Sequence, residues 1–301
     1  MKTSMREANW GEFVITRLIK ATGYSAILFI GLIFVFLLRE GAPTLLEVPL
    51  RTLFSARWYP IEGYFGLLPL IGGSLLVTLG AAMIAVPFGL ATAVYISEIA
   101  PRWARELLKP LVELLGGLPS VMLGFLGILV LTSWVRTTLD LATGLTAFTG
   151  AILLGGISIP TIVSVAEDAL DAVPRSYREA GLALGATHWQ TIWRVTLPAA
   201  RSGVLTAVML GLGRAIGETM AVMMVTGNAP TLPTGLGALF RPARTMTATI
   251  AAEMGEVANG SVHYHTLFAI GIVLFAISLA VNLTAASLVF RQRKRAERIL
   301  S

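Results

Sequence analysis

The chain has 301 residues, of which 55% are hydrophobic and 13% are charged, and its formal net charge is +6. Soluble domains carry about 25% charged residues, so this composition excludes an ordinary soluble protein. The chain contains no cysteine, which excludes disulfides, thiolate metal sites and cysteine nucleophiles. Of the three histidines, His188, His263 and His265, the last two fall in a polar loop without a third ligand nearby. We therefore expect solvated histidines and no metal site.

Six apolar stretches are candidates for membrane-spanning helices, each of which needs about 20 largely apolar residues. They cover approximately residues 23–38, 67–96, 111–135, 145–165, 202–225 and 267–290. Glu113 and Pro119 interrupt the start of the third stretch. The first stretch follows a polar segment and lacks a small-residue cleavage site, so it is expected to be a retained anchor and not a signal peptide. The sequence therefore predicts an all-α, polytopic membrane protein with six transmembrane helices.

The distribution of lysine and arginine predicts the orientation of these helices. With the N-terminus inside, 16 of the 23 Lys and Arg residues lie in inner segments and 6 in outer segments. This bias predicts that both termini are cytoplasmic. It also explains the net positive charge, so we expect no nucleic-acid partner. The basic run Arg291–Arg295 is expected to anchor the last helix at the lipid headgroups.

The longest inner loop, about residues 166–200, reads EDALDAVPRSYREAGLALGATHWQTIWRVTLPAA. Pro174 suits the first turn of a helix, and Gly185 suits a turn that ends one. A second short helix is expected over His188–Val195. A compact helical hairpin on the inner face indicates a docking element for a soluble partner.

This loop resembles the E-A-A, three residues, Gly, nine residues, Ile, one residue, Leu-Pro motif of permease subunits of ABC importers. The matching residues are Glu179, Ala180, Gly181, Gly185, Val195, Leu197 and Pro198, where Gly181 replaces the second Ala and Val195 replaces Ile. The resemblance implies that the hairpin inserts into a cleft of an ATP-binding subunit. Ala180 and Gly181 would then permit close approach, and Pro198 would set the angle at which the chain re-enters the membrane.

A charged residue, Arg214, falls within the fifth apolar stretch, and Glu218 follows four residues later. An arginine near the bilayer centre costs roughly 2.5–3.5 kcal/mol on insertion scales, so it usually faces a polar cavity or a partner. Residues four apart share a helical face. The pair could merely hold helices together, or Arg214 could bind an anion while Glu218 holds and tunes it. Gly211, Gly213 and Gly217 flank the pair and could serve helix packing, the commoner use, or leave room for a solute.

A longer segment resembles one particular type of permease. Gly213–Asn228, GRAIGETMAVMMVTGN, and Glu113–Val121 resemble the PstC-type permeases of bacterial phosphate importers, and the resemblance extends from about Trp58 to Asn282. It implies a type I ABC importer permease fold in the bacterial cytoplasmic (inner) membrane. It also implies a PstA-type second permease, a dimer of PstB-type ATP-binding subunits and a periplasmic phosphate-binding protein. Arg214, Glu218 and Thr219 would then belong to the translocation path.

The apolar stretches and the charge distribution, together with the resemblance, imply a layout of five parts. These are a cytoplasmic segment over 1–22, a first transmembrane helix over 23–38, a periplasmic loop over 39–66, a five-helix permease domain over 67–290 and a basic cytoplasmic tail over 291–301.

Two similar motifs, LLGGLPS ending at Ser120 and LLGGISIP containing Ser158, place Gly-Gly and Pro inside apolar stretches. Helices broken near the bilayer centre can expose backbone groups to substrate, which makes Ser120 and Ser158 candidate path residues. Simple helix kinks or chance would produce the same pattern.

The sequence lacks a G-x-x-x-x-G-K-[ST] phosphate loop, so we expect no cofactor on this chain and ATP hydrolysis by a partner subunit. One alternative is an ABC permease for another oxyanion, such as sulfate, molybdate or tungstate. A second is an intramembrane enzyme, but the apolar stretches hold no Asp pair, Ser–Lys pair or metal-ligand helix. A third is a gated channel, which would leave the inner loop unexplained.

Overall fold

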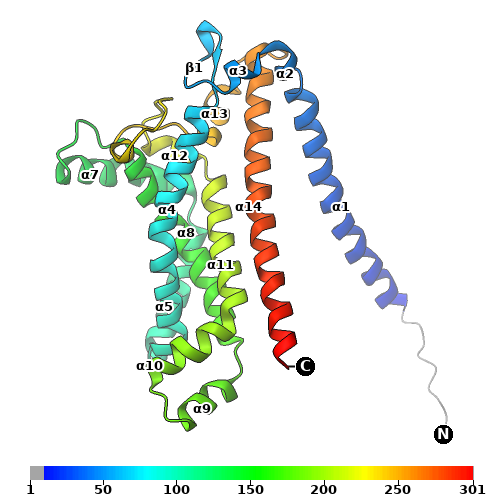
Figure 1. Ribbon diagram of the computed structural model, residues 1–301, viewed down its shortest axis with the longest axis vertical. Helices are drawn as coiled ribbons and strands as arrows, with labels where there is room; N and C mark the ends of the chain where they lie inside the picture. The colour runs from blue at the N-terminus through cyan, green and yellow to red at the C-terminus, as the bar shows by residue number, and fades with distance from the viewer. Residues whose placement is uncertain (1–9, 301) are drawn as a thin grey trace.

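The computed structural model describes residues 10–300, which are almost entirely helical (Figure 1). Six helical segments are long and apolar enough to cross a membrane: Phe13–Glu47, Leu68–Ile99, Ser120–Thr138, Ala147–Asp171, His188–Gly217 and Val262–Thr284. The prediction of an all-α protein with six transmembrane helices is confirmed.

The ends of the helices agree with the predicted orientation. In Figure 1, the start of α1 (Trp10–Gly41) and the end of α14 (Val262–Leu300) lie at the lower end of the molecule. The two short helices of the inner loop, α9 (Arg175–Ala183) and α10 (His188–Thr191), lie at that same end. Both helical termini and the inner loop therefore share one side of the membrane, as the charge distribution predicts.

At the opposite end, short helices and strands connect the long helices and cover their ends. They are α2 (Thr44–Glu47), α3 (Leu50–Leu53), β1 (Trp58–Tyr59), η1 (Pro60–Glu62), β2 (Tyr64–Phe65), η5 (Leu236–Phe240) and α13 (Met246–Glu253). Strands β1 and β2 form an antiparallel hairpin in which Trp58 and Phe65 are buried. Because α1 is already helical from Trp10, the first helix is longer than the predicted 23–38.

Three helices form the centre of the structure: α4 (Leu68–Val94), α8 (Ala147–Asp171) and α11 (Leu197–Gly217). Lipid supplies no hydrophobic drive for helix association, so close packing of small residues has to replace it. A Cβ on Gly89 of α4 would lie 2.8 Å from the side chain of Ile162 on α8. α4 ends in a π-helical turn, η2 (Tyr95–Ile99), at the cytoplasmic side.

The third predicted span, 111–135, is wrong in its boundaries. Helix α5 (Arg102–Gly117) ends before Leu118 and Pro119, which are extended. A new helix then runs through α6 (Ser120–Leu126), η3 (Gly127–Leu131) and α7 (Thr132–Thr138). Proline disfavours helical geometry in the residue before it, which places the break at Leu118.

The fifth predicted span, 202–225, is also interrupted. Helix α11 ends at Gly217, Glu218 is extended with φ −70° and ψ 129°, and α12 covers Met220–Val225. By contrast, α8 continues through Gly155, Gly156 and Pro160. Only the first of the two similar Gly-Gly-Pro motifs therefore breaks a helix.

Two of the three histidines differ from the expectation of solvated loop residues. His263 and His265 lie at the start of α14. His263 Nε2 is 2.8 Å from Glu253 Oε2, and His265 Nδ1 is 2.8 Å from the carbonyl oxygen of Glu40. The two rings therefore connect the ends of α13 and α1 to the start of α14. Within residues 10–300, His, Asp and Glu form no group of three or more that could hold a metal ion.

Candidate functional site

Arg214 lies in the last turn of α11 and bridges two other helices. Its Nη1 donates a hydrogen bond to Thr161 Oγ1 on α8 at 3.1 Å, and its Nη2 donates to the carbonyl oxygen of Gly116 at the end of α5 at 3.2 Å. Both acceptors are neutral, and across residues 10–300 no carboxylate forms an ion pair with Arg214. The positive charge is therefore positioned without being neutralised. A guanidinium group held in this way can bind an oxyanion with its remaining N–H groups.

The predicted pairing of Arg214 with Glu218 is wrong, because the helix ends before it reaches Glu218. Glu218 Oε1 accepts hydrogen bonds from the backbone N–H groups of Thr219 at 3.1 Å and Ala221 at 3.3 Å. The carboxylate thus caps the first turn of α12, whose N–H groups have no helical partner. Thr247 Oγ1 donates to the carbonyl oxygen of Glu218 at 3.0 Å, which ties the break to α13.

The glycines of α11 divide between packing and open space. A Cβ on Gly211 would clash with the Ile162 side chain, so Gly211 serves close packing on α8. A Cβ on Gly213 or Gly217 would meet nothing within 4 Å. The two glycines next to Arg214 and Glu218 therefore leave space beside the charged residues.

The other predicted path residues lie in different settings. Ser120 is partly buried at the start of α6, directly after the break that frees the Gly116 carbonyl. Thr219 lies in the α11–α12 break, and its hydroxyl donates to the Gly217 carbonyl at 3.3 Å. Ser158 does not fit a path role, because its side chain is buried and donates to the Leu154 carbonyl of its own helix at 2.9 Å.

Thr161 and Gly116 are site residues that the sequence reasoning missed. Both belong to or adjoin the two Gly-Gly-Pro motifs: Gly116 is the first glycine of LLGGLPS, and Thr161 directly follows Pro160 of LLGGISIP. A single threonine directly after a proline in an apolar stretch was the available signal.

The inner loop forms the predicted hairpin. Gly185 has φ +83°, in the left-handed region that favours glycine. It follows Leu184, the residue that caps the end of α9, and turns the chain toward α10. A capping box at Thr187 and Gln190 starts α10. The chain then runs through the π-helical turn η4 (Ile192–Thr196) directly into α11. Leu197 and Pro198 form the first turn of α11, which places Pro198 where the chain re-enters the membrane.

Ala180 and Gly181 face different environments. Ala180 is exposed next to the exposed Glu179, whereas Gly181 is buried. A Cβ on Gly181 would lie 3.3 Å from Thr191 side-chain atoms and 3.4 Å from Val195 Cγ2. Gly181 therefore lets α9 pack on the second half of the hairpin, and of these two small residues Ala180 is the one available for contact with a partner.

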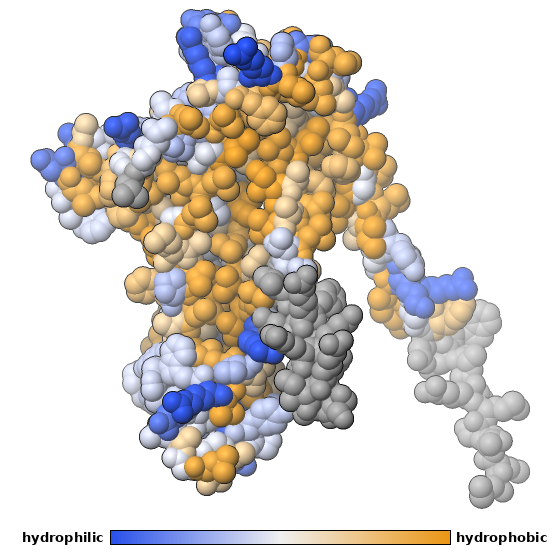
Figure 2. Space-filling view, viewed as in Figure 1, coloured by the Kyte–Doolittle hydropathy of each residue, from blue (hydrophilic) through white to orange (hydrophobic). Residues whose placement is uncertain are grey.

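Large apolar side chains cover the free face of the hairpin. Tyr177, Leu182, Leu184, Trp189 and Trp193 are all exposed, and Leu184 reaches 89%. Figure 2 shows hydrophobic colour at the lower tip of the molecule within a mostly polar surface. Exposed apolar patches rimmed by polar residues are typical of protein interfaces. The hairpin therefore has the surface of a docking element.

Comparison with known proteins adds a family match. Residues 85–295 match the family model described as binding-protein-dependent transport system inner membrane component. A probable ABC transporter permease protein, YqgH, of Bacillus subtilis is 43% identical over 76% of this chain and 74% of its own length. The phosphate transport system permease protein PstC of Mesorhizobium japonicum is 33% identical over 96% of this chain and 94% of its own length.

Two solved structures share the fold. A bacterial ABC transporter involved in the import of alginate has a TM-score of 0.59 at 17% identity, covering 95% of this chain and 99% of that chain. An inward-facing form of the MetNI methionine ABC transporter has a TM-score of 0.58 at 18% identity, covering 73% and 93%. At these identities the likeness concerns the fold alone, and it confirms the predicted type of permease fold.

Proposed function

Because the chain belongs to the family of binding-protein-dependent transport system inner membrane components, we propose that it is a membrane-spanning permease subunit of an ATP-driven importer of inorganic phosphate. Its relative from Mesorhizobium japonicum is named a phosphate transport system permease protein, and it matches nearly the whole chain. Such a subunit binds no cofactor of its own and leaves ATP hydrolysis to a partner. Family membership also answers the alternative of an intramembrane enzyme, because the family consists of transport components.

The observation that carries the proposal of an anionic substrate is the environment of Arg214. Its guanidinium group is held by the Thr161 hydroxyl and the Gly116 carbonyl, and among the described residues 10–300 no carboxylate forms an ion pair with it. Inorganic phosphate is a tetrahedral oxyanion that accepts several hydrogen bonds, which suits a planar set of N–H donors. The open space beside Gly213 and Gly217 supports passage of a small solute at this point.

The surface of the chain supports the remaining partners of the importer. The exposed apolar face of α9 and α10 would dock an ATP-binding subunit of the PstB type. Figure 1 shows α1 next to α14 at the upper end and diverging from it toward the lower end, and the apolar side chains of α1 are exposed along most of its length. Membrane lipid and a PstA-type second permease would cover these surfaces. A periplasmic phosphate-binding protein would deliver substrate to the outer end.

A second candidate substrate is another oxyanion, such as sulfate, molybdate or tungstate, because one arginine would attract any of them. A reconstitution experiment separates the candidates. The chain is placed in liposomes with the second permease, the ATP-binding subunit and the binding protein, and ATP-dependent uptake of radiolabelled phosphate is measured. We expect phosphate uptake that excess unlabelled sulfate or molybdate does not inhibit. Uptake of sulfate or molybdate instead of phosphate would contradict the proposed substrate.

A further inference from the structure

A polar cavity separates the helix α9 from the cytoplasmic ends of α4 and α8. The cavity has a volume of about 470 Å³, and its walls include Ser97, Glu98, Arg105, Asp171 and Arg178. The backbone of α9 packs mainly against η4 and α10, in its own hairpin. Side chains that cross the cavity therefore determine how firmly α9 is attached to the cytoplasmic ends of α4 and α8.

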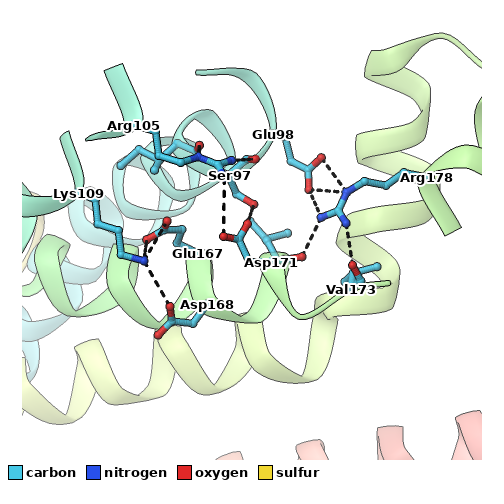
Figure 3. A network of polar contacts seen from close by, with 11 residues as sticks. Ser97, Glu98, Arg105, Lys109, Glu167, Asp168, Asp171, Val173 and Arg178 are labelled. Atoms are coloured by element: carbon cyan, nitrogen blue, oxygen red, sulfur yellow. Dashed lines mark hydrogen bonds and ion pairs between the residues drawn. The ribbon is translucent and has the colours of Figure 1, made fainter. Parts of the chain in front are cut away.

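Arg178 of α9 makes this crossing (Figure 3). Its Nη2 lies 2.6 Å from Glu98 Oε1, and its Nε lies 3.2 Å from both carboxylate oxygens of Glu98. Nη1 donates to the Val173 carbonyl at 2.7 Å, and Nη2 donates to the Leu170 carbonyl at 2.9 Å. Arg178 thus binds the end of α4 through Glu98, the end of α8 through the Leu170 carbonyl, and the segment that follows α8 through the Val173 carbonyl. The side chain of Glu98 is only 5% exposed, so the ion pair is screened little by water.

Two further sets of polar contacts connect α5 to the ends of α4 and α8. Arg105 donates to the carbonyl groups of Ile96 and Ser97, and Ser97 Oγ donates to Asp171 Oδ1 at 2.5 Å. Lys109 Nζ lies 3.2 Å from Glu167 Oε2, and the hydrogen bond to Glu167 raises the pKa of Lys109. Figure 3 shows these two sets of contacts near the Arg178–Glu98 pair.

Helices α5 and α8, which the Lys109–Glu167 contact joins directly, are the two that hold Arg214. Gly116 is at the end of α5, Thr161 is on α8, and each accepts one hydrogen bond from the Arg214 guanidinium group. A displacement of α5 relative to α8 would therefore change how many N–H groups of Arg214 are free. Coupling between distant sites needs a contiguous physical connection of this kind.

We propose that Arg178 is a positioning residue that transmits movement of α9 to α4 and α8 during the ATP-driven cycle. The proposal rests on the docking of an ATP-binding subunit at α9 proposed above. A guanidinium group bound to a carboxylate through several N–H groups has a fixed geometry, so it acts as a rigid connection. Without it, α9 would remain attached through its own hairpin, and its movement would be absorbed in the cavity.

The first test uses the double variant Arg178→Gln/Glu98→Gln in the complete reconstituted importer. Changing both residues avoids leaving one buried charge without its partner. We expect ATPase docking and basal ATP hydrolysis to stay within about twofold of the wild type, while uptake per ATP falls about tenfold. The matched control is Arg175→Gln, on the same helix, since Arg175 forms no ion pair within residues 10–300. This control should transport normally.

A second test replaces the ionic connection with a covalent one. The chain has no cysteine, so Glu98→Cys/Arg178→Cys carries the only two thiols in the subunit. We expect this variant to be uncoupled, and we expect a short bis-maleimide to restore uptake by joining α4 to α9 again. The two single-cysteine variants should gain nothing from the reagent.

Normal uptake per ATP in the double-glutamine variant would overturn the proposal. Loss of docking in that variant would also overturn it, because Arg178 would then belong to the docking surface. Failure of the bridged variant to recover, with docking intact and both thiols consumed, would count against a mechanical connection. Absence of ATPase binding to the wild-type chain would instead contradict the proposed function.

Discussion

Arg214 and Gly116 are 98 positions apart in the sequence, and a hydrogen bond of 3.2 Å from Arg214 Nη2 to the Gly116 carbonyl oxygen joins them. The carbonyl is free to accept it because α5 ends at Gly117, before the extended residues Leu118 and Pro119. A helix break thus supplies the backbone group that orients a charged side chain within the membrane. Comparable breaks create substrate sites in other transporters.

Replacement of Arg214 by glutamine should abolish phosphate uptake while the protein still inserts and assembles. Glutamine can keep one hydrogen bond to Thr161 or Gly116, but it lacks the charge that attracts the anion. A charged hydrogen bond contributes about 1.5–3 kcal/mol, so uptake should fall at least about tenfold. Radiolabelled phosphate uptake in liposomes measures the effect. Arg136→Gln, at an exposed position on α7, is the control for a lost positive charge. Normal uptake by an assembled Arg214→Gln complex would contradict the anion-path role.

Thr161→Val should weaken transport by removing the hydroxyl group that holds Arg214 Nη1. Valine has nearly the same shape, so the packing of α8 should change little. Loss of one hydrogen bond to a charged group predicts a rise of about tenfold or more in the phosphate concentration at half-maximal uptake. Thr161→Ser keeps the hydroxyl and should behave like the wild type. Equal kinetics for the valine and serine variants would show that Thr161 does not position Arg214.

Glu218→Gln should reduce uptake less than loss of Arg214 does. The Glu218 side chain caps α12, and the glutamine amide oxygen can still accept the N–H groups of Thr219 and Ala221. Glu218→Ala removes the cap and should cost about 1 kcal/mol of local stability. Uptake should therefore decrease in the order wild type, Glu218→Gln, Glu218→Ala. The ranking is wrong if Glu218→Gln loses all uptake and Arg214→Lys keeps it.

The sequence predicts well what depends on neighbouring residues. The length of the apolar stretches gives the six spans, and the turn at Gly185 follows from glycine's access to positive φ. The Glu–Ala–Gly segment and Leu197-Pro198 locate the hairpin because their spacing is local. These features need no knowledge of how distant helices pack.

The site depends on contacts that the sequence does not contain. Thr161 lies 53 positions from Arg214 and Gly116 lies 98, so neither was a visible partner. The spacing of Arg214 and Glu218 suggested a pair only as long as the helix was assumed to continue. Thr247, 29 positions away, binds the Glu218 carbonyl group that the helix break leaves free. Breaks of this kind are stabilised by tertiary contacts, and helix propensity alone does not reveal them.

The final prediction concerns Gly185 and Ala180 in the inner hairpin. Gly185 has φ +83°, and a Cβ there would meet nothing within 4 Å, so Gly185→Val acts only through backbone strain of about 1–2 kcal/mol. Asparagine tolerates this conformation, which makes Gly185→Asn the matched control. Ala180→Glu adds bulk and charge to an exposed position of α9 without entering the interior of the chain.

Both Gly185→Val and Ala180→Glu should impair ATPase docking or uncouple ATP hydrolysis from uptake, while the membrane helices remain folded. Pull-down of the ATP-binding subunit and phosphate-stimulated ATPase activity in liposomes measure the two effects. Gly185→Asn should dock and transport nearly as the wild type does, since the turn keeps its shape. Because the free face of α9 and α10 carries exposed aromatic and aliphatic side chains, a charge at position 180 should weaken an apolar interface. Full docking and full coupled activity in both variants would mean that the hairpin is only a connector.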